Sequence, residues 1–298
     1  MSVERPVVHV IEMKVEPKTR ADEAKMRAAL NAMAQEDPTF GVMVDAESGE
    51  IILKGMGELH LDSKLDQLQR VYGVDSNCGA PQVAYRETLA RQAEVRFSYQ
   101  DKQRGDVATV GLRLEPADLD FENMLVSDLD DDPEWDRFVD GIKTGVRQVW
   151  EQGVLIGFPM VDMKVTLLNM LFYNDSSPND FIAAARLAIR EGCENAGVKL
   201  LEPVMAVEVV TPPEFIIEIR LDLDARRGRI QGMSMRDDLT VIQVLVPMSC
   251  LFGYASAVRL LGQGRVVHSM TFSHFADVPR HISGGGPENF PPAIGMRA

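Results

Sequence analysis

The sequence predicts an α+β fold of three domains, and three observations lead to this prediction. The chain has 298 residues, 45% of them hydrophobic, which suffices for two or three separate cores. Segments with strand-like alternation and segments with helical spacing of apolar residues follow one another along it. Near the N-terminus these segments follow the order βαββαβ, which is ferredoxin-like. We expect domains over residues 1–88, 89–203 and 204–278, and a tail over 279–298.

The first domain is organised by a joint between a strand and a helix. The apolar run 51–53 predicts a strand, Gly55 and Gly57 allow a sharp turn, and apolar residues recur at helical spacing over 61–72. These segments supply the third strand and the second helix of the βαββαβ order.

A strand over 6–15, a first helix, and strands over 40–44 and 74–78 complete this domain. Thr19 and Asp22 are three residues apart, which predicts a capping box at the start of the helix. Its buried face is expected to carry four apolar residues: Met26, Ala29, Leu30 and Met33.

The second domain begins with strands over 93–99 and 107–114 around the polar loop 100–106, and a third strand over 121–127. The acidic run 128–136 follows. We interpret it as a helix start, because proline suits the first helical turn and carboxylates favour its positive end. Calcium binding is the alternative, but the EF-hand spacing of glycine and glutamate is absent.

The helix after the acidic run is expected to bury one face, made of Trp135, Phe138, Ile142, Val146 and Val149. A strand over 161–168 and a loop through Asn174 come next. A helix over 178–194, capped by Ser177 and Asp180, completes the domain.

The third domain opens with a strand over 204–210, and the segment after it is ambiguous. Apolar and charged residues alternate over 215–227 as in a strand, whereas a preceding proline and the following Gly228 punctuate a helix. Paired strands over 230–235 and 240–246 follow.

A helix from Met248 and a strand over 266–275 end this domain. If 215–227 is helical, the domain repeats the βαββαβ order of the first. The tail 279–298 is rich in glycine and proline, and we expect it to lack a single structure.

Composition limits the partners. The net charge of −14 argues against non-specific adhesion to nucleic acid, so any RNA contact must be local. We find no signal peptide and no apolar run of transmembrane length, which predicts a cytoplasmic protein without a membrane partner. The 3 cysteines lie far apart in the sequence, and we expect reduced thiols that are mostly buried.

The sequence carries no catalytic signature that we recognise. It contains no phosphate-loop motif, no catalytic triad and no paired-histidine metal motif. His60 and Asp62 are two residues apart, so on a helix they point to different faces. We therefore expect no catalytic residue and no metal site.

The densest basic cluster comprises Arg226, Arg227, Gly228 and Arg229, in which the glycine would let backbone approach a phosphate closely. A solvated helix end, with cations at its negative pole, is about equally favoured by the sequence. Lys102 and Arg104 form a weaker patch, diluted by neighbouring aspartates.

Ten short motifs, taken in order, resemble elongation factor G, a ribosomal translocase, over about residues 6–279. They comprise 36–38, 55–62, 81–88, 157–162, 175–177, 201–203, 208–212, 226–230, 252–255 and 263–265. The resemblance identifies the three domains as III, IV and V of that family, with the middle one of the domain IV type. It also implies that 215–227 is helical.

The resemblance implies partners as well. Domain IV would enter the decoding region of the small ribosomal subunit, and domain V would meet large-subunit RNA, so ribosomal RNA and ribosomal proteins are expected and DNA is not. The family's GTP-binding domain and the barrel after it have no counterpart here. GTP and magnesium would bind that domain, so this chain is expected to hold no cofactor and to catalyse nothing alone, although the family is a translational GTPase.

The chain departs from the family at the two loops that should meet RNA. The first reads 101–105, with Lys102 and Arg104, where the family has a glycine-rich run. The second, 169–174, contains Phe172 and Tyr173 and lacks the family's histidine. The leading hypothesis is the ribosome-binding C-terminal portion of a translocase. A diverged paralogue acting as a ribosome-associated regulator or scaffold is the alternative, and an enzyme with its own hydrolytic site is a distant third.

Overall fold

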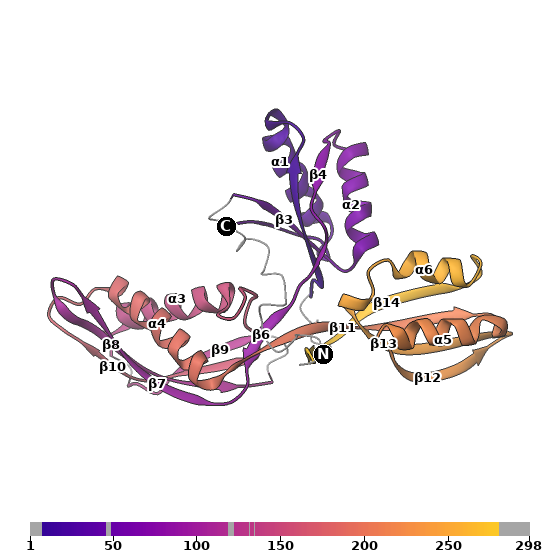
Figure 1. The fold of residues 1–298 in the computed structure, drawn as a ribbon. Helices are drawn as coiled ribbons and strands as arrows, with labels where there is room; N and C mark the ends of the chain where they lie inside the picture. Colours follow the sequence, from indigo (N-terminus) through magenta and orange to yellow (C-terminus); the bar gives the residue numbers. More distant parts are fainter. Residues whose placement is uncertain (1–7, 46–48, 119–121, 131, 134, 280–298) are drawn as a thin grey trace. The chain divides into compact units, whose positions relative to one another are not determined.

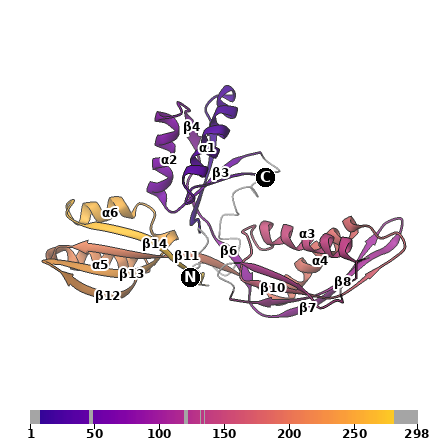
Figure 2. The ribbon, with the colours of Figure 1, turned by 180° about the vertical axis from the view of Figure 1, so that it is seen from behind.

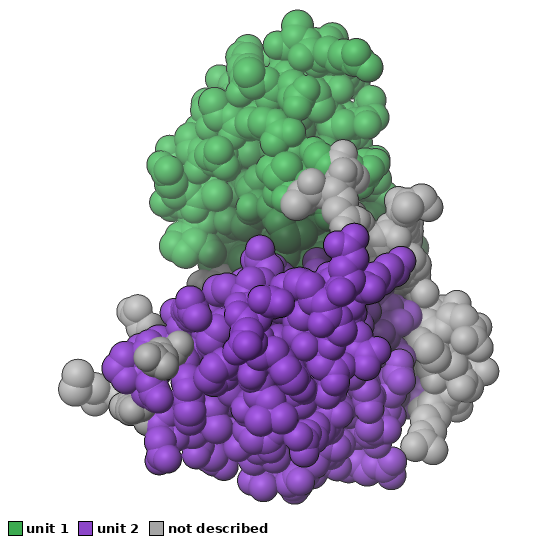
Figure 3. Space-filling model, turned by 90° about the vertical axis from the view of Figure 1, so that its left-hand side faces the viewer, with its two compact units in different colours: residues 1–84, 202–276, 294–298 green, residues 85–201, 277–293 purple. Residues whose placement is uncertain are grey.

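The computed structural model describes residues 8–45, 49–118, 122–130, 132–133 and 135–279. The chain divides into two compact units, coloured separately in Figure 3. Of the described residues, unit 1 comprises those within 8–84 and 202–276, and unit 2 comprises those within 85–201 and 277–279. The expected domain boundaries at residues 88, 203 and 278 remain predictions.

The N-terminal half of unit 1 is a ferredoxin-like α/β layer (Figure 1). Its antiparallel sheet has the strand order β2-β3-β1-β4, with β5 paired to β1. Two helices, α1 and α2, contact each other and complete the predicted βαββαβ order. The elements are β1 (Ile11–Pro17), a 3₁₀ turn (Arg20–Asp22), α1 (Glu23–Glu36), β2 (Gly41–Val44), β3 (Ile51–Gly55), α2 (Glu58–Arg70), β4 (Ser76–Cys78) and β5 (Gln82–Val83).

The buried face of α1 is the predicted one, but its start is not. All four apolar residues expected on that face are at most 3% exposed. The predicted capping box is wrong, because the Thr19 hydroxyl donates to the Asp22 carboxylate at 2.6 Å. The Asp22 N–H instead bonds to the Thr19 carbonyl, which makes the first turn 3₁₀.

The C-terminal half of unit 1 repeats this topology. Its sheet has the order β12-β13-β11-β14, which matches β2-β3-β1-β4 position by position. The elements are β11 (Val198–Thr211), a 3₁₀ turn (Pro213–Phe215), α5 (Ile216–Ala225), β12 (Arg229–Arg236), β13 (Leu239–Pro247), a 3₁₀ turn (Met248–Cys250), α6 (Tyr254–Leu261) and β14 (Val267–Asp277).

The ambiguous segment is helical, as the family resemblance implied. Ile219 and Leu223, four residues apart, are buried at 1% and 0% exposure. Ile217 and Leu221 lie on the opposite face and are 70% and 64% exposed. The two outward residues produced the misleading alternation.

Unit 2 is a mixed sheet covered by helices on one face (Figures 1 and 2). The strand order is β7-β8-β10-β9, in which β9 and β10 are parallel and α3 connects them. The first residues of β11, 198–201, pair with β6. The remaining elements are β6 (Arg86–Leu89), β7 (Ala93–Asp101), β8 (Gly105–Pro116), β9 (Asn123–Ser127), α3 (Asp136–Gln152), β10 (Met163–Phe172) and α4 (Pro178–Ala196).

Three local expectations in unit 2 need correction. Helix α3 begins at Asp136, so Pro133 lies before the helix and not in its first turn. Pro133 belongs to a turn in which the Trp135 N–H donates to the Asp132 carbonyl. Trp135 is therefore only partly buried. Strand β10 runs on to Phe172 instead of ending at residue 168, because a bulge after Leu167 restores its pairing with β8.

The predicted cap of α4 is present, and α4 packs closely on α3. The Asp180 carboxylate accepts the Ser177 backbone N–H at 2.8 Å. Gly141 and Gly145 of α3 face α4, where an added Cβ would lie 2.6 and 2.5 Å from carbonyl oxygens. The two helices therefore meet backbone to backbone.

The three thiols differ in exposure. The expectation that the cysteines are mostly buried is wrong: only Cys193 is buried, whereas Cys250 is intermediate and Cys78 is exposed. Cys78 ends β4, an edge strand whose last two residues are exposed. No helix in the described part of the chain is long and apolar enough to cross a membrane. The expectation for the tail falls on residues 280–298, outside the described residues.

Candidate nucleic-acid interface

The basic cluster at 226–229 closes helix α5. Gly228 N–H bonds to the Leu223 carbonyl at 2.8 Å and Arg227 N–H to the Asp224 carbonyl at 3.1 Å, the two bonds of a Schellman motif. A Cβ on Gly228 would lie 2.6 Å from the Leu223 carbonyl oxygen. The helix end itself therefore requires this glycine, whatever approaches from outside.

Arg226 faces the interior of unit 1. Its Nε donates to Asp222 at 2.9 Å, and one terminal nitrogen donates to the Cys250 carbonyl at 2.8 Å. The guanidinium also lies over the Tyr254 ring, 5.1 Å from its centroid. These contacts engage two of its three nitrogens within the fold.

Arg227 is held in a left-handed conformation by an ion pair. Its φ is 62°, which is unusual for a residue other than glycine. The guanidinium donates to both oxygens of Glu202, at 2.5 and 3.2 Å, and the Glu202 side chain is only 3% exposed. The Ser249 hydroxyl donates to the same carboxylate at 3.0 Å. Arg227 thus neutralises a buried charge.

Arg229 differs from its neighbours. It begins β12, is exposed, and makes no ion pair within the described residues. Of the predicted cluster, it is the side chain that the fold leaves available to an external phosphate.

The two loops at the end of unit 2 are joined by Arg104. Its guanidinium donates to both oxygens of Asp180, at 2.9 and 3.2 Å, and to the Asp175 carbonyl at 2.8 Å. Burial alone would raise the pKa of Asp180, but hydrogen bonds from Arg104 and Ser177 hold that pKa below its ordinary value. Arg104 is therefore a structural clamp between the β7–β8 hairpin and the start of α4.

The remaining predicted residues lie in or next to these loops and are exposed. Lys102 is exposed in the hairpin turn, without an ion pair within the described residues. Phe172 is 47% exposed and stacks on buried Phe138 with ring centroids 5.5 Å apart, and Tyr173 is 40% exposed. We call Lys102, Phe172 and Tyr173 the tip. An exposed cation and exposed aromatic rings, in loops that Arg104 joins, are groups that can contact an unpaired RNA strand.

Glu87 is the residue that sequence reasoning missed. Its carboxylate is completely buried and accepts the backbone N–H groups of five consecutive residues, 154–158, at 2.7–3.1 Å. This ring of donors links the motifs 81–88 and 157–162. The signal in the sequence was a single acidic residue within an otherwise strand-like run, and its partners lie 67 to 71 positions away.

A second polar cluster explains the motif 36–38. Asp37 accepts from Lys64 at 2.8 Å and from the Thr39 hydroxyl at 2.6 Å. His60 Nδ1 accepts the Met56 N–H at 3.2 Å, so its Nε2 carries the proton donated to Asp37 at 3.3 Å. Lys64 and Thr39 hold the pKa of Asp37 well below its usual range. The histidine therefore links the turn at Met56 to the Asp37 carboxylate.

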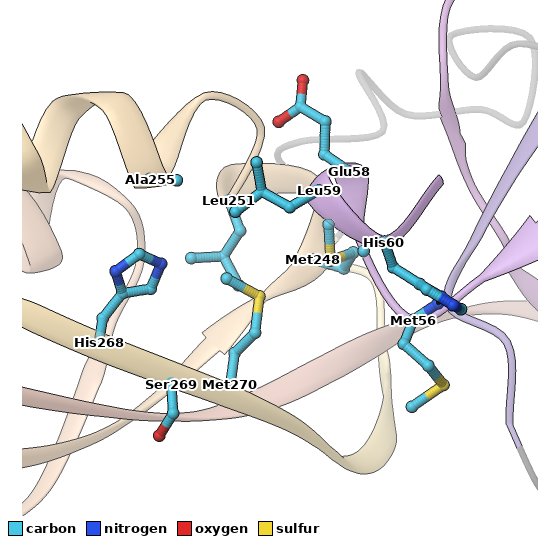
Figure 4. Close-up of a pocket in the computed structure, with 11 residues that line it drawn as sticks. Met56, Glu58, Leu59, His60, Met248, Leu251, Ala255, His268, Ser269 and Met270 are labelled. Carbon is cyan, nitrogen blue, oxygen red and sulfur yellow. The ribbon is translucent and has the colours of Figure 1, made fainter. Parts of the chain in front are cut away.

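A cavity of about 270 Å³ within unit 1 is mostly apolar (Figure 4). Leu251 and Met270 lie between His60 on one side and His268 on the other. Burial lowers the pKa of His268, which favours its neutral form. No group of three metal-ligating side chains occurs among the described residues. The cavity therefore offers mainly apolar contacts.

The fold defines a class of α+β proteins with two ferredoxin-like layers and a mixed sheet covered by helices on one face. Three family models match the chain in order: elongation factor G domain III over residues 7–80, domain IV over 81–197, and the elongation factor G C-terminus over 199–284. The chain belongs to the elongation factor G family and corresponds to its domains III, IV and V.

Its relatives agree. The chain is 44% identical over 281 residues to elongation factor G of Paracoccus denitrificans, and equally to that of Cereibacter sphaeroides. The alignment covers 92% of this chain and 39% of each relative, so the chain spans well under half their length. A crystal structure of a Thermus thermophilus protein matches with a TM-score of 0.68 and 33% identity, over 95% of this chain and 43% of that one.

Proposed function

We propose that this chain is the ribosome-binding portion of a cytoplasmic translocase and takes part in moving tRNA and mRNA through the ribosome. The three elongation factor G domains in unbroken order carry the proposal. Ribosomal RNA and ribosomal proteins are its partners, together with the family's GTP-binding domain. GTP and magnesium bind that domain, so this chain alone hydrolyses nothing.

The tip is the part of unit 2 that contacts ribosomal RNA in this proposal. Lys102 supplies a cation, and Phe172 and Tyr173 supply faces on which bases stack, each stack contributing about 1–3 kcal/mol. Because the chain is strongly acidic, only such local contacts neutralise phosphates. Arg229 provides a second, independent contact on unit 1.

Ribosome co-sedimentation at several salt concentrations tests the proposal. We expect the wild-type chain to pellet with ribosomes, with a shallow salt dependence because few phosphates are neutralised. The triple variant Lys102→Ala, Phe172→Ala, Tyr173→Ala should pellet at least tenfold less well. Arg186→Ala, which removes an exposed cation from α4, is the matched control.

Two results would contradict the proposal. If the wild-type chain does not pellet with ribosomes at low salt, the proposal that it binds ribosomes is wrong. If the triple variant pellets as well as the wild type, the proposal that the tip contacts ribosomal RNA is wrong. A melting curve for each variant separates lost contacts from lost folding. Saturable binding of GTP to the chain would contradict the assignment of nucleotide to the other domain.

A further inference from the structure

A second cationic site lies on unit 2 between α3 and the edge strand β9. A cavity of about 240 Å³ is lined by Lys143, Arg147 and Trp150 of α3 and by Asn123 and Leu125 of β9. Residues 143, 147 and 150 are four and three positions apart, so they share one face of the helix. Strand β9 ends the order β7-β8-β10-β9, which places the cavity at the edge of the sheet.

The charged groups of the cavity are largely uncommitted. Arg147 is exposed and makes no ion pair within the described residues. Lys143 contacts Asp140 at 3.1 Å, but these side chains are 42% and 71% exposed, so the pair is weak. A guanidinium and a readily released ammonium therefore line the same cavity.

Two further polar side chains line the cavity, and they differ in whether the fold already engages them. Asn123 is committed to the fold, donating to the Met160 carbonyl at 2.7 Å and accepting the Met163 N–H at 3.0 Å. The Trp150 indole N–H is buried and has no acceptor within the described residues. The Trp150 ring therefore supplies an apolar wall of the cavity, and the two cations supply its free donors.

We propose that this cavity binds a phosphate group of an RNA backbone. The Arg147 guanidinium and the Lys143 ammonium are both cationic donors, and a guanidinium matches two phosphate oxygens at once. The inference rests on the proposed function for the choice of RNA and adds a contact separate from the tip. Phe138, which supports the tip, and Arg147 are nine residues apart on α3, or about 14 Å along its axis.

The two tryptophans of the chain make the test specific. Trp135→Phe leaves Trp150 as the sole indole, so its fluorescence reports on the cavity. In phosphate-free buffer, a short single-stranded RNA should change this fluorescence saturably. Arg147→Ala in the same background should weaken binding about tenfold, because a charge-assisted contact is lost. It should also reduce the salt slope by about 0.7, whereas Arg186→Ala should change neither.

Labelled-RNA anisotropy with the native tryptophans provides a second measurement if Trp135→Phe unfolds the chain. An equal loss of affinity in Arg147→Ala and Arg186→Ala would overturn the inference, as would the absence of saturable RNA binding. A response to inorganic phosphate alone would show a small-anion site and overturn the RNA assignment. If RNA binds here but wild-type chain does not pellet with ribosomes, the proposed function fails and this inference stands. If pelleting is normal but Arg147→Ala binds RNA like wild type, the inference alone fails.

Discussion

Replacing Glu87 with glutamine should destabilise unit 2 while preserving the size of the side chain. In the wild type, Oε1 accepts three N–H groups and Oε2 accepts two. Glutamine offers one oxygen, so its better orientation still leaves the N–H groups of Val154 and Leu155 facing an NH₂ group. Each buried donor without an acceptor costs about 1–3 kcal/mol. We therefore expect Glu87→Gln to lower the free energy of unfolding by about 2–6 kcal/mol.

Urea unfolding followed by tryptophan fluorescence measures this effect in unit 2, because Trp135 and Trp150, the two tryptophans of the chain, both belong to that unit. Glu94→Gln is the matched control, since Glu94 is 55% exposed and pairs with Arg113 at 2.7 Å. A surface pair of this kind contributes about 0–1 kcal/mol. If Glu87→Gln costs no more than Glu94→Gln, the ring of backbone donors does not stabilise the fold as argued.

Three further perturbations test unit 1 and the thiols. Arg227→Ala leaves the Glu202 carboxylate buried without a cation, so it should lower the free energy of unfolding by about 3 kcal/mol, measured by urea unfolding followed by circular dichroism. Arg229→Ala should change this free energy by no more than about 0.5 kcal/mol. Similar losses in the two variants would contradict a structural role for Arg227. The pKa of Asp37 is depressed in the folded state, chiefly by Lys64, so its stabilisation is present above the ordinary carboxyl pKa of about 3.9 and is lost as the pH falls below it. Wild type should thus lose more stability than Asp37→Asn between about pH 5 and pH 3, and parallel pH profiles would refute the argument. Burial raises the pKa of the Cys193 thiol to about 12, whereas Cys78 is exposed. A thiol reagent should therefore label Cys78 quickly and Cys193 only after unfolding, and mass spectrometry of the labelled chain measures this difference.

The spacing of apolar residues predicted the secondary structure correctly in segments where it matched only one period, that of a helix or that of a strand. The four buried residues of α1 and the buried face of α3 follow helical spacing, and the βαββαβ order of the first domain came from such segments. The segment 215–227 could not be settled from its pattern, because exposed Ile217 and Leu221 imitate a strand within a ten-residue helix. The end of β10 was missed because a bulge carries pairing into residues that look like a loop.

The candidate site was harder to predict, because partners distant in sequence decide which cations are available. Arg226, Arg227 and Arg104 look like RNA-binding residues in the sequence, yet each is engaged by a carboxylate of its own unit. Lys102 and Arg229 have the same local character and remain exposed. Only the tertiary fold distinguishes these two groups.

The position of β12 has a consequence for how the protein behaves at high concentration. It is the outermost strand of its sheet, and Met233 and Met235 on it are 44% and 66% exposed. An apolar edge of this kind is a template on which a strand from another molecule can add. Arg229 and Arg236 stand at its two ends. Arg236 pairs only weakly with Glu208, at 3.7 Å, and is 65% exposed, so like charges on approaching copies repel each other. A cation at either end therefore opposes the addition of a strand from another copy, and this effect of Arg229 does not depend on any contact with RNA.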